Sequence, residues 1–454
     1  MRHGQMESGT RTPVGSVLIL LLAVLLMGCH WEDPEYYNPL DPGEDADIWV
    51  FLDRLDQRDT PLDPVIRQAV ASSGAPTKFS LGSLWVWGNQ HGGAVNTLEG
   101  LEFFSQTNWL GLENVQLENG VDLTPLTRMR RLENLFLSGN GFDDATVANI
   151  PHISQLKHLS LRDNQIADAA AFIPLIGQYG TARLSVEIGG NPFPVATLSA
   201  LGVALQSLSG LSITSLSEPI SDFAFLVENE TIQWLNISYN ALPEVLQGLS
   251  RLRRLEHLEL AGAGLDNTRL ATLPVFPGLR LLNISDNAIS SGQDIATYLS
   301  NYGTGRLNLN VRGNILGPAE LQDFAVALNQ LEWLYLEVQN AEPILDLNFL
   351  RTNATIHGLG LSMITFSGGL ENPIDISAVS RLSALEWLDI ADNQGNEIQG
   401  LQALLELPRL REVNVSNSFN MRFDILDQLL VRGVFVHGYD GPADPTDPND
   451  PNAP

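Results

Sequence analysis

The sequence lacks the features that mark most enzymes and disulfide-stabilised proteins. Cysteine occurs once in 454 residues, at Cys29, so no intramolecular disulfide can form. The common catalytic and phosphate-binding signatures HExxH, GxSxG, GxxxxGK, GxGxxG and CxxC do not occur. No segment outside the repeats described below is long enough for a catalytic domain. We therefore predict no catalytic residues, no cofactor and no enzyme activity.

Histidine is scarce and scattered. Two of the eight histidines, His158 and His257, occupy equivalent positions of the repeats. They lie four repeats apart, which is roughly 19 Å at about 4.8 Å per strand and too far for a shared metal ion. The aspartates of the C-terminal segment are too widely spaced for a calcium loop. We predict no metal site.

Basic residues are also few, since 25 Lys and Arg stand against 53 Asp and Glu. The formal net charge of -28 argues against nucleic acid, which requires a basic stripe to bind phosphates. It also argues against a protein lying flat on an anionic membrane. Residues 30–63 hold eleven of the acidic residues, yet the repeats remain acidic without them. Such a surface favours neutral or basic partners.

Long hydrophobic runs are limited to the eleven residues Val17–Met27. A membrane-spanning helix needs about 20 apolar residues, so this run is typical of a signal peptide instead. The run ends in Leu26-Met27-Gly28-Cys29, which resembles the bacterial lipobox. This resemblance implies cleavage before Cys29, lipidation of Cys29 and, because His30 follows, retention at the outer membrane. A plain secretory signal with an accidental cysteine is the alternative.

From Leu81 onward one pattern recurs: apolar, two residues, apolar, one residue, apolar, two residues, and often Asn. Leu132–Asn140 and Leu385–Asn393 are clear examples. Fourteen units, spaced by 20 to 31 residues, are apolar at their fourth and sixth positions, and eight have Asn at the ninth. The ninth positions are 89, 120, 140, 164, 191, 216, 240, 263, 287, 314, 339, 364, 393 and 418. Such regularity indicates a solenoid with one continuous core.

These units resemble the leucine-rich-repeat family, and 98–104 and 121–126 are similar to the internalin-type bacterial repeats. The resemblance implies an α/β solenoid: a right-handed β-α superhelix with a parallel concave sheet of about 14 strands. The fourth and sixth residues of each unit would point inward, and the Asn would bond backbone at the following turn. Longer units leave room for helices at Ala169–Gly177 and Asp294–Tyr302.

The chain divides into five predicted segments. Residues 1–28 are the lipoprotein signal peptide, and 29–47 are the lipidated Cys and a flexible tether rich in Pro and Asp. Residues 48–80 form an N-terminal helical cap, in which Asp63 is the N-cap of a helix that ends near Gly74. Residues 81–440 are the repeat domain with its C-terminal cap, a helix from Asp424 to Gly433 and a last strand. Residues 441–454 are a disordered Asp/Pro tail.

A longer repeat is nested within the short ones. Tyr179–Leu184 recurs as Tyr302–Leu307, which begins 123 residues later. The pair Phe225-Leu226 recurs as Phe349-Leu350. A block of about five units was therefore duplicated, and the two copies keep their core residues but differ at outward-facing strand positions.

The third, fifth and seventh residues of each unit should face solvent on the concave sheet. These positions hold many aromatic residues, which are typical binding anchors. They are Trp85, Trp87, Phe136, Trp234, Trp333, Tyr335 and Trp387. For Trp85 and Trp87 we expect packing on each other or under the cap, and for the other five a role in binding.

One part of this surface predicts a more specific site. Because of Gly358 and Gly360, one strand has almost no side chains on the concave face. Neighbouring strands should raise Trp333 and Tyr335 on one side and Trp387 on the other, about 10 Å apart across two strand spacings. We predict a slot for a sugar ring or an apolar side chain. Its edge would be formed by Glu337 and Asp389.

Together these patterns predict a non-enzymatic recognition protein, anchored in the cell envelope by lipid, that binds a protein partner through its concave face. Adhesion or another cell-surface interaction fits this prediction. Two alternatives stay open. One is a surface lipoprotein that binds carbohydrate at the slot, and the other is a scaffold within the envelope. The lipid would be the protein's only contact with the membrane.

Overall fold

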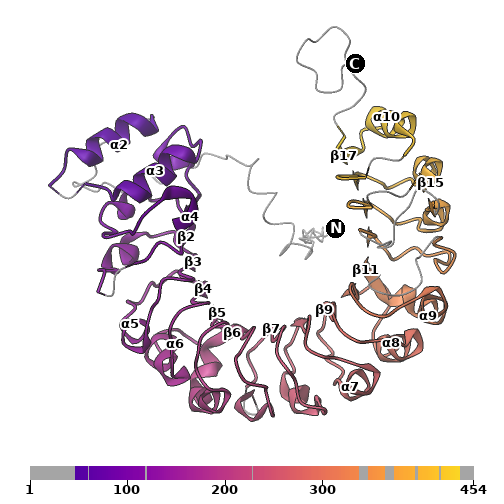
Figure 1. Ribbon diagram of the computed structural model, residues 1–454, viewed down its shortest axis with the longest axis horizontal. Helices are drawn as coiled ribbons and strands as arrows, with labels where there is room; N and C mark the ends of the chain where they lie inside the picture. The colour runs from indigo at the N-terminus through magenta and orange to yellow at the C-terminus, as the bar shows by residue number, and fades with distance from the viewer. Residues whose placement is uncertain are drawn as a thin grey trace, which may run out of the picture.

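The computed structural model describes residues 47–59, 61–117, 120–226, 229–336, 346–362, 373–393, 397–418 and 421–439. The predicted signal peptide, Cys29, the tether up to residue 46, the tail and Glu337 lie outside these described residues. Within them the chain winds into an open arc, with strands along its inner side and helices along its outer side (Figure 1). None of the helices described is long and apolar enough to cross a membrane.

The strands of the inner side form one parallel sheet of 15 strands in chain order, apart from β13 and β15. A parallel sheet in sequential order is what stacked repeats produce, because each unit contributes one strand beside the last. The strands are β1 Ser83–Trp87, β2 Trp109–Glu113, β3 Asn134–Phe136, β4 His158–Ser160, β5 Leu184–Glu187, β6 Leu208–Ser212, β7 Trp234–Asn236, β8 His257–Glu259, β9 Leu281–Asn283, β10 Leu307–Asn310, β11 Leu331–Tyr335, β12 Gly358–Gly360, β14 Trp387–Asp389, β16 Glu412–Asn414 and β17 Phe435–His437. The pair β13 Ile374–Asp375 and β15 Ile398–Gln399 forms a separate two-stranded sheet.

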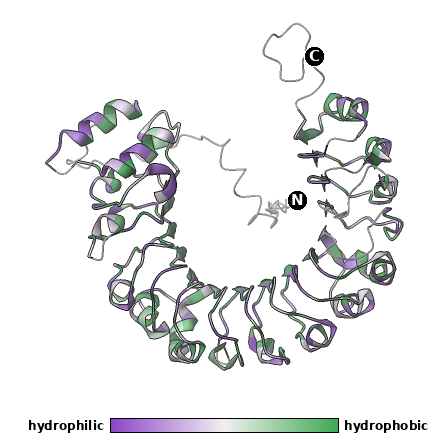
Figure 2. Ribbon diagram, viewed as in Figure 1, coloured by the Kyte–Doolittle hydropathy of each residue, from purple (hydrophilic) through white to green (hydrophobic). Residues whose placement is uncertain are grey.

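The outer side mixes α-helices with 3-10 helices. The α-helices are α2 Ile48–Asp56, α3 Pro64–Ser72, α4 Gly88–His91, α5 Asp144–Ala148, α6 Phe172–Ile176, α7 Asn267–Thr272, α8 Gly292–Leu299, α9 Pro318–Phe324 and α10 Phe423–Val431. The 3-10 helices are η1 Lys78–Ser80, η2 Leu101–Phe103, η3 Thr124–Arg128, η4 Ala169–Ala171, η5 Val195–Ser207, η6 Ala224–Leu226, η7 Gln247–Arg251, η8 Ala325–Gln330, η9 Ser377–Arg381 and η10 Leu401–Glu406. Both predicted helical segments are helical, as η4 with α6 and as α8. The outer helices carry both hydrophobic and hydrophilic residues (Figure 2).

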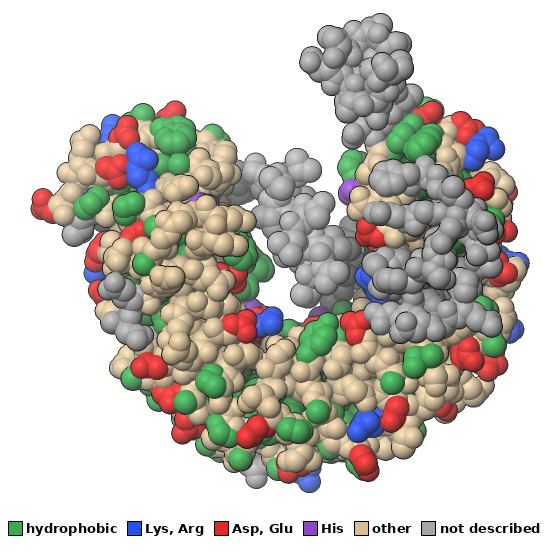
Figure 3. Space-filling view, viewed as in Figure 1, with side chains coloured by type: hydrophobic (Ala, Val, Ile, Leu, Met, Phe, Trp, Pro, Cys, Tyr) green, Lys and Arg blue, Asp and Glu red, His purple; other side chains and the backbone are tan. Residues whose placement is uncertain are grey.

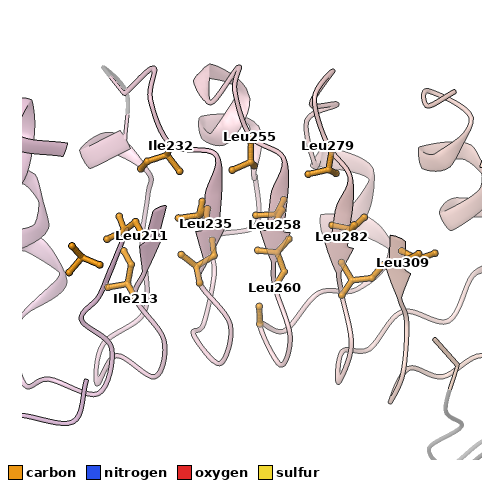
Figure 4. Close-up of a cluster of buried hydrophobic side chains, with 14 of the residues drawn as sticks. Leu211, Ile213, Ile232, Leu235, Leu255, Leu258, Leu260, Leu279, Leu282 and Leu309 are labelled. Atoms are coloured by element: carbon orange, nitrogen blue, oxygen red, sulfur yellow. The ribbon is translucent and has the colours of Figure 1, made fainter. Parts of the chain in front are cut away.

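The core lies between the sheet and these helices. The fourth residue of each unit points into it, and the side chains of Leu211, Leu235, Leu258 and Leu282 form one continuous row (Figure 4). All four are at most 1% exposed. Truncation of one such leucine to alanine typically costs about 2–5 kcal/mol, so the row holds adjacent units together.

A ladder of buried asparagines closes seven of the units after their strands. Asn164 donates from Nδ2 to the carbonyls of Leu137 and Leu161, at 3.2 and 3.0 Å. Its Oδ1 accepts the backbone N–H groups of Asn140 and Phe142, at 3.0 and 3.1 Å. The side chain of Asn164 thus forms hydrogen bonds with the backbone at the end of its own strand and with the backbone of the preceding unit. The sequence analysis had predicted hydrogen bonds to the backbone of the following turn instead. The same bonds to carbonyls recur at Asn140, Asn191, Asn240, Asn287, Asn314 and Asn393.

The predicted frame of the second unit is wrong. A ninth position at 120 places a strand near Asn114–Gln116, but the observed strand is β2, which pairs with β1 from Ser83 opposite Trp109. Asn114 and Gln116 have positive φ angles of 54° and 49° and belong to the turn. The error arose because buried apolar residues continue beyond the strand end, so that two overlapping frames fit the pattern. The correct frame brings Trp109 onto the concave face.

Helical caps cover both ends of the core. At the start of α3 the side chain of Asp63 accepts the N–H groups of Val65 and Asn96, each at 2.9 Å. Asp63 is therefore the N-cap that the sequence predicts, and it also joins the cap to the first repeat. At the other end α10 buries Ile425 and Leu426, and β17 adds a fifteenth strand to the 14 expected from the repeats.

Candidate recognition surface on the concave sheet

Parallel pairing aligns the outward residues of the strands in rows across the concave face. Third positions form one row, in which Trp109 pairs with Asn134, and Asn134 with His158. Fifth positions form a second row, in which Gly111 pairs with Phe136. These rows contain every predicted ligand-binding residue that the structure describes: Phe136 on β3, Trp234 on β7, Trp333 and Tyr335 on β11, Gly358 and Gly360 on β12, and Trp387 and Asp389 on β14.

Four aromatic residues near the N-terminal end of the sheet pack into one group, here called the N-terminal aromatic cluster: Trp85, Trp87, Trp109 and Phe136. The Trp85 and Trp87 rings stack with centroids 5.4 Å apart, as expected from the sequence. The ring centroid of Phe136 lies 4.9 Å from that of Trp85 and 5.8 Å from that of Trp109. All four rings are half-buried, so each keeps part of its surface in contact with solvent.

Three more rings form a C-terminal aromatic cluster: Trp333, Tyr335 and Trp387. The Trp387 centroid lies 5.4 Å from that of Trp333 and 5.8 Å from that of Tyr335, with the planes tilted by 44° and 59°. The prediction of an open slot about 10 Å wide between these residues is therefore wrong. Their side chains lean across the bare strand and meet each other.

The glycines explain why the slot is filled. A Cβ atom on Gly358 would lie 1.8 Å from Cε3 of Trp333, and one on Gly360 would lie 2.5 Å from Cδ1 of Tyr335. Both rings therefore occupy the space that side chains on β12 would need. Gly358 and Gly360 thus allow the rings to lie against the sheet.

Between the two clusters, Trp234 and several ionisable groups line the concave face. The indole Nε1 of Trp234 donates a 2.8 Å hydrogen bond to Oε1 of Glu259. Nε2 of His158 lies 3.5 Å from Oε1 of Glu187, and its ring centroid lies 6.4 Å from that of Trp234. The hydrogen bond to Glu259 thus orients the ring of Trp234 on the surface.

Burial shifts the pKa values of the ionisable groups on this face. Burial raises the pKa of Glu259, and the negative charge of the nearby Glu187 raises it further. The hydrogen bond from Trp234 lowers this pKa and so offsets part of the rise. Burial likewise raises the pKa of Asp389, while the N–H of Ala391 and the charge of Arg312 lower it. Burial lowers the pKa of His158, and the negative charge of Glu187 offsets only part of this. Carboxylates that have lost hydration in this way gain from a cationic partner.

Burial also raises the pKa of Glu113, which lies at the end of β2, and the charge of Glu187 adds to this rise. Glu113 and Trp109 were missed because the second unit was read in the wrong frame. Glu187 and Glu259 stand at fifth positions of correctly placed units, so a survey of charged residues at those positions would have found them.

Acidic side chains are spread over the visible face of the arc (Figure 3). In the part of the chain that the structure describes, no three His, Cys, Asp or Glu residues gather closely enough to hold a metal ion. The concave sheet offers rigid, half-exposed rings beside carboxylates, an arrangement suited to contact with another molecule.

No protein-family model matches the sequence. No curated protein matches it either. The structure resembles an internalin of Listeria monocytogenes with a TM-score of 0.38 and 17% identity over 83% of this chain and 94% of the internalin. It resembles a chain of the yeast Rad7–Elc1 complex with a TM-score of 0.48 and 18% identity over 76% of this chain and 84% of that one.

A third similar structure is the TLR13–ssRNA13 complex, with a TM-score of 0.38 and 16% identity over 69% of this chain and 47% of that chain. At such identities these likenesses concern the architecture alone. The repeat pattern, the asparagine ladder and the single stack of parallel strands show that the chain folds as an α/β leucine-rich-repeat solenoid.

Proposed function

We propose that this chain is a non-enzymatic recognition protein that binds a protein partner through its concave face. The observation that supports this most is the pair of aromatic clusters. Tryptophan and tyrosine are enriched at the energetic centres of protein interfaces because they bury a large area at a small cost in conformational entropy. Rings that already lie fixed against the sheet lower that cost further.

The same geometry favours a protein over a carbohydrate. The gap that a sugar ring would enter is closed by contact among Trp333, Tyr335 and Trp387. What remains is a curved surface that carries two aromatic clusters together with the carboxylates of Glu259 and Asp389. The acidic charge favours a neutral or basic partner over nucleic acid.

The proposal includes attachment to the cell envelope through Cys29. It rests on the lipobox-like sequence and on the stretch of residues 30–46, which would hold the repeats away from the membrane. More than one acyl chain is needed for stable anchoring, and lipoproteins that carry a lipobox receive more than one. The outer membrane is the proposed location, and cell-surface interaction the proposed role.

The experiment is cross-linking on living cells, followed by identification of the captured proteins. We compare wild type with the triple variant Trp234→Ala, Trp333→Ala and Trp387→Ala. Trp49→Ala is the matched control, since this indole is 53% exposed on α2, outside the sheet. A partner captured by wild type and by the control, but lost in the triple variant, supports the proposal. Equal capture by all three proteins contradicts it.

A further inference from the structure

The centre of the concave face, between the two aromatic clusters, is organised around the indole of Trp234 on β7. Gly210 on β6 is its partner in the sheet, and a Cβ there would lie 2.7 Å from Cε3 of the indole. At the other edge of the ring, Nε1 donates to Oε1 of Glu259 on β8 at 2.8 Å. Because Gly210 has no side chain, the indole extends from β6 to β8, with a carboxylate at its pyrrole edge.

A second carboxylate lies beyond the benzene edge of this indole. The ring centroid of His158 on β4 is 6.4 Å from that of Trp234, and Nε2 of His158 lies 3.5 Å from Oε1 of Glu187 on β5. Oγ of Ser160 donates to Oε2 of Glu187 at 3.0 Å, so both oxygens of this carboxylate have a neighbour. In the strand order, Trp234 therefore lies between Glu259 on one side and the pair of His158 and Glu187 on the other.

The strand residues between the two carboxylates are small or short. Glu187 pairs with Ser212, Ser212 with Asn236, and Asn236 with Glu259. The Cα atoms of the two glutamates are thus three strand spacings apart, which is roughly 14 Å. Ser212 is 1% exposed, so neighbouring side chains cover it. The negative charge of Glu187 raises the pKa of Glu259, so each carboxylate acts on the other.

The negative charge of this group is not balanced by the residues that the structure describes. The charge that acts on Glu259 is that of Glu187, which has the same sign. Asp389 differs, because the positive charge of Arg312 acts on it. His158 does not supply a positive charge to Glu187, since burial lowers the pKa of the imidazole and favours its neutral form. Two partly dehydrated carboxylates of like charge gain from a cation that lies between them.

An arginine side chain matches this arrangement. Its guanidinium is planar, so it can stack on the indole while its N–H groups donate to carboxylates at the edges of the ring. The ammonium group of lysine is a compact, strongly hydrated charge and cannot stack in this way. We propose that the concave face binds one arginine side chain of the protein partner at Trp234, between Glu187 and Glu259. This inference rests on the proposed function, because it states what the partner presents at the centre of the face.

The first test titrates the full chain, labelled isotopically at its tryptophan indole nitrogens, and follows the NMR signal of Trp234. That signal is identified by its loss in Trp234→Phe. The probes are the N-acetyl amides of arginine, lysine and citrulline, the last of which has the shape of arginine without its charge. The arginine probe is expected to bind with a Kd of about 1 mM. The other two are expected to bind at least about tenfold more weakly.

Equal shifts of the Trp234 signal by the arginine and citrulline probes would show that charge plays no part, and would overturn the inference. Equal affinity for the lysine and arginine probes would also overturn it, because a site that recognises a planar cation must distinguish them.

Isosteric variants locate the site. Glu187→Gln and Glu259→Gln preserve side-chain shape, and each is expected to weaken binding of the arginine probe about tenfold, because each removes one charge-assisted contact. Asp389→Asn is the matched control, since it removes one charge from the same face at a place where Arg312 already acts. It is expected to leave the Kd unchanged. An equal loss in all three variants, with wild-type circular dichroism spectra and Tm, would indicate general attraction to an acidic face and contradict the inference.

Cell cross-linking separates this inference from the proposed function. The double variant Glu187→Gln and Glu259→Gln is compared with the triple tryptophan variant described above. Loss of the partner in both variants supports both proposals. If the partner is lost in the triple variant but captured as well as by wild type in the double variant, only the arginine site is wrong. If both variants capture it as wild type does, the proposed function is wrong as well.

Discussion

At the scale of single residues, the buried asparagines contribute stability through hydrogen bonds to backbone groups of two adjacent units. Each donates to carbonyls, and six of them, Asn140, Asn164, Asn191, Asn240, Asn287 and Asn314, also accept N–H groups of the preceding unit. Loss of one leaves several backbone groups unpaired in the core, at about 1–3 kcal/mol for each group. The ladder therefore affects the whole solenoid, because neighbouring units share its bonds.

We predict that Asn164→Ala destabilises the protein by about 2–4 kcal/mol, since the N–H groups of Asn140 and Phe142 lose their acceptor. Urea denaturation measures the effect. Asn89→Ala is the matched control, because Asn89 stands at the ninth position of the first unit but is exposed. Equal stability of the two variants would show that the ladder bonds contribute little.

A second prediction at this scale concerns Glu259. Burial raises its pKa above the ordinary value of 4.5, so the folded protein holds the proton more tightly than the unfolded chain does. The stability that the protonated group contributes is full below pH 4.5 and is lost as the pH rises through the raised pKa. Glu259→Gln should therefore be more stable than wild type at pH 7.

This difference should shrink as the pH falls toward 4.5 and disappear well below it, where Glu259 is protonated in both states. Thermal denaturation between pH 4 and pH 8 tests the prediction. Glu244→Gln, a change at an exposed carboxylate, is the control. A Glu259→Gln variant that is less stable than wild type at pH 7 would contradict it.

At the scale of elements, periodicity identified thirteen of the fourteen predicted repeat strands but failed where apolar residues extend past a strand. In the second unit Leu110, Leu112, Val115 and Leu117 are all buried, so the alternation does not mark where the strand ends. Only pairing with β1 decides this, since the register places Trp109 opposite Ser83. The helices show the same limit. Unit length predicted room for them, but it did not predict whether they take α or 3-10 geometry.

We predict that Asp63→Ala weakens the attachment of the N-terminal cap. Asp63 is 2% exposed and accepts N–H groups from both α3 and the following segment. Loss of an N-cap alone costs about 0.5–2 kcal/mol, and the unpaired N–H of Asn96 adds to this. Asp143→Ala removes the exposed N-cap of α5 and serves as the control. Hydrogen exchange should show faster exchange across α3 only in Asp63→Ala, and unchanged protection would refute the prediction.

At the scale of the whole molecule, the chain is an arc that carries rigid rings along its inner side and acidic charge throughout. The proposed attachment to a membrane would depend on a single residue, Cys29. We predict that the mature protein partitions into the detergent phase in Triton X-114 extraction of cells and that Cys29→Ala moves it to the aqueous phase. The reason is that acyl chains on Cys29 would supply the apolar anchor. Intact-protein mass spectrometry should show the acyl mass only in wild type, and equal partitioning would exclude lipid anchoring.

The sequence by itself determined the repeat architecture, because apolar residues at the fourth and sixth positions of each unit can be buried only if the units stack in one direction. It also placed Trp234, Trp333 and Trp387 on the concave face, since strand residues alternate between core and solvent. Tertiary structure alone decided what those residues do there. A glycine beside a tryptophan suggested a gap, but the ring lies across the bare backbone because that contact removes apolar surface from water. The same holds at Gly210, where a Cβ atom would lie 2.7 Å from Cε3 of Trp234 on the neighbouring strand.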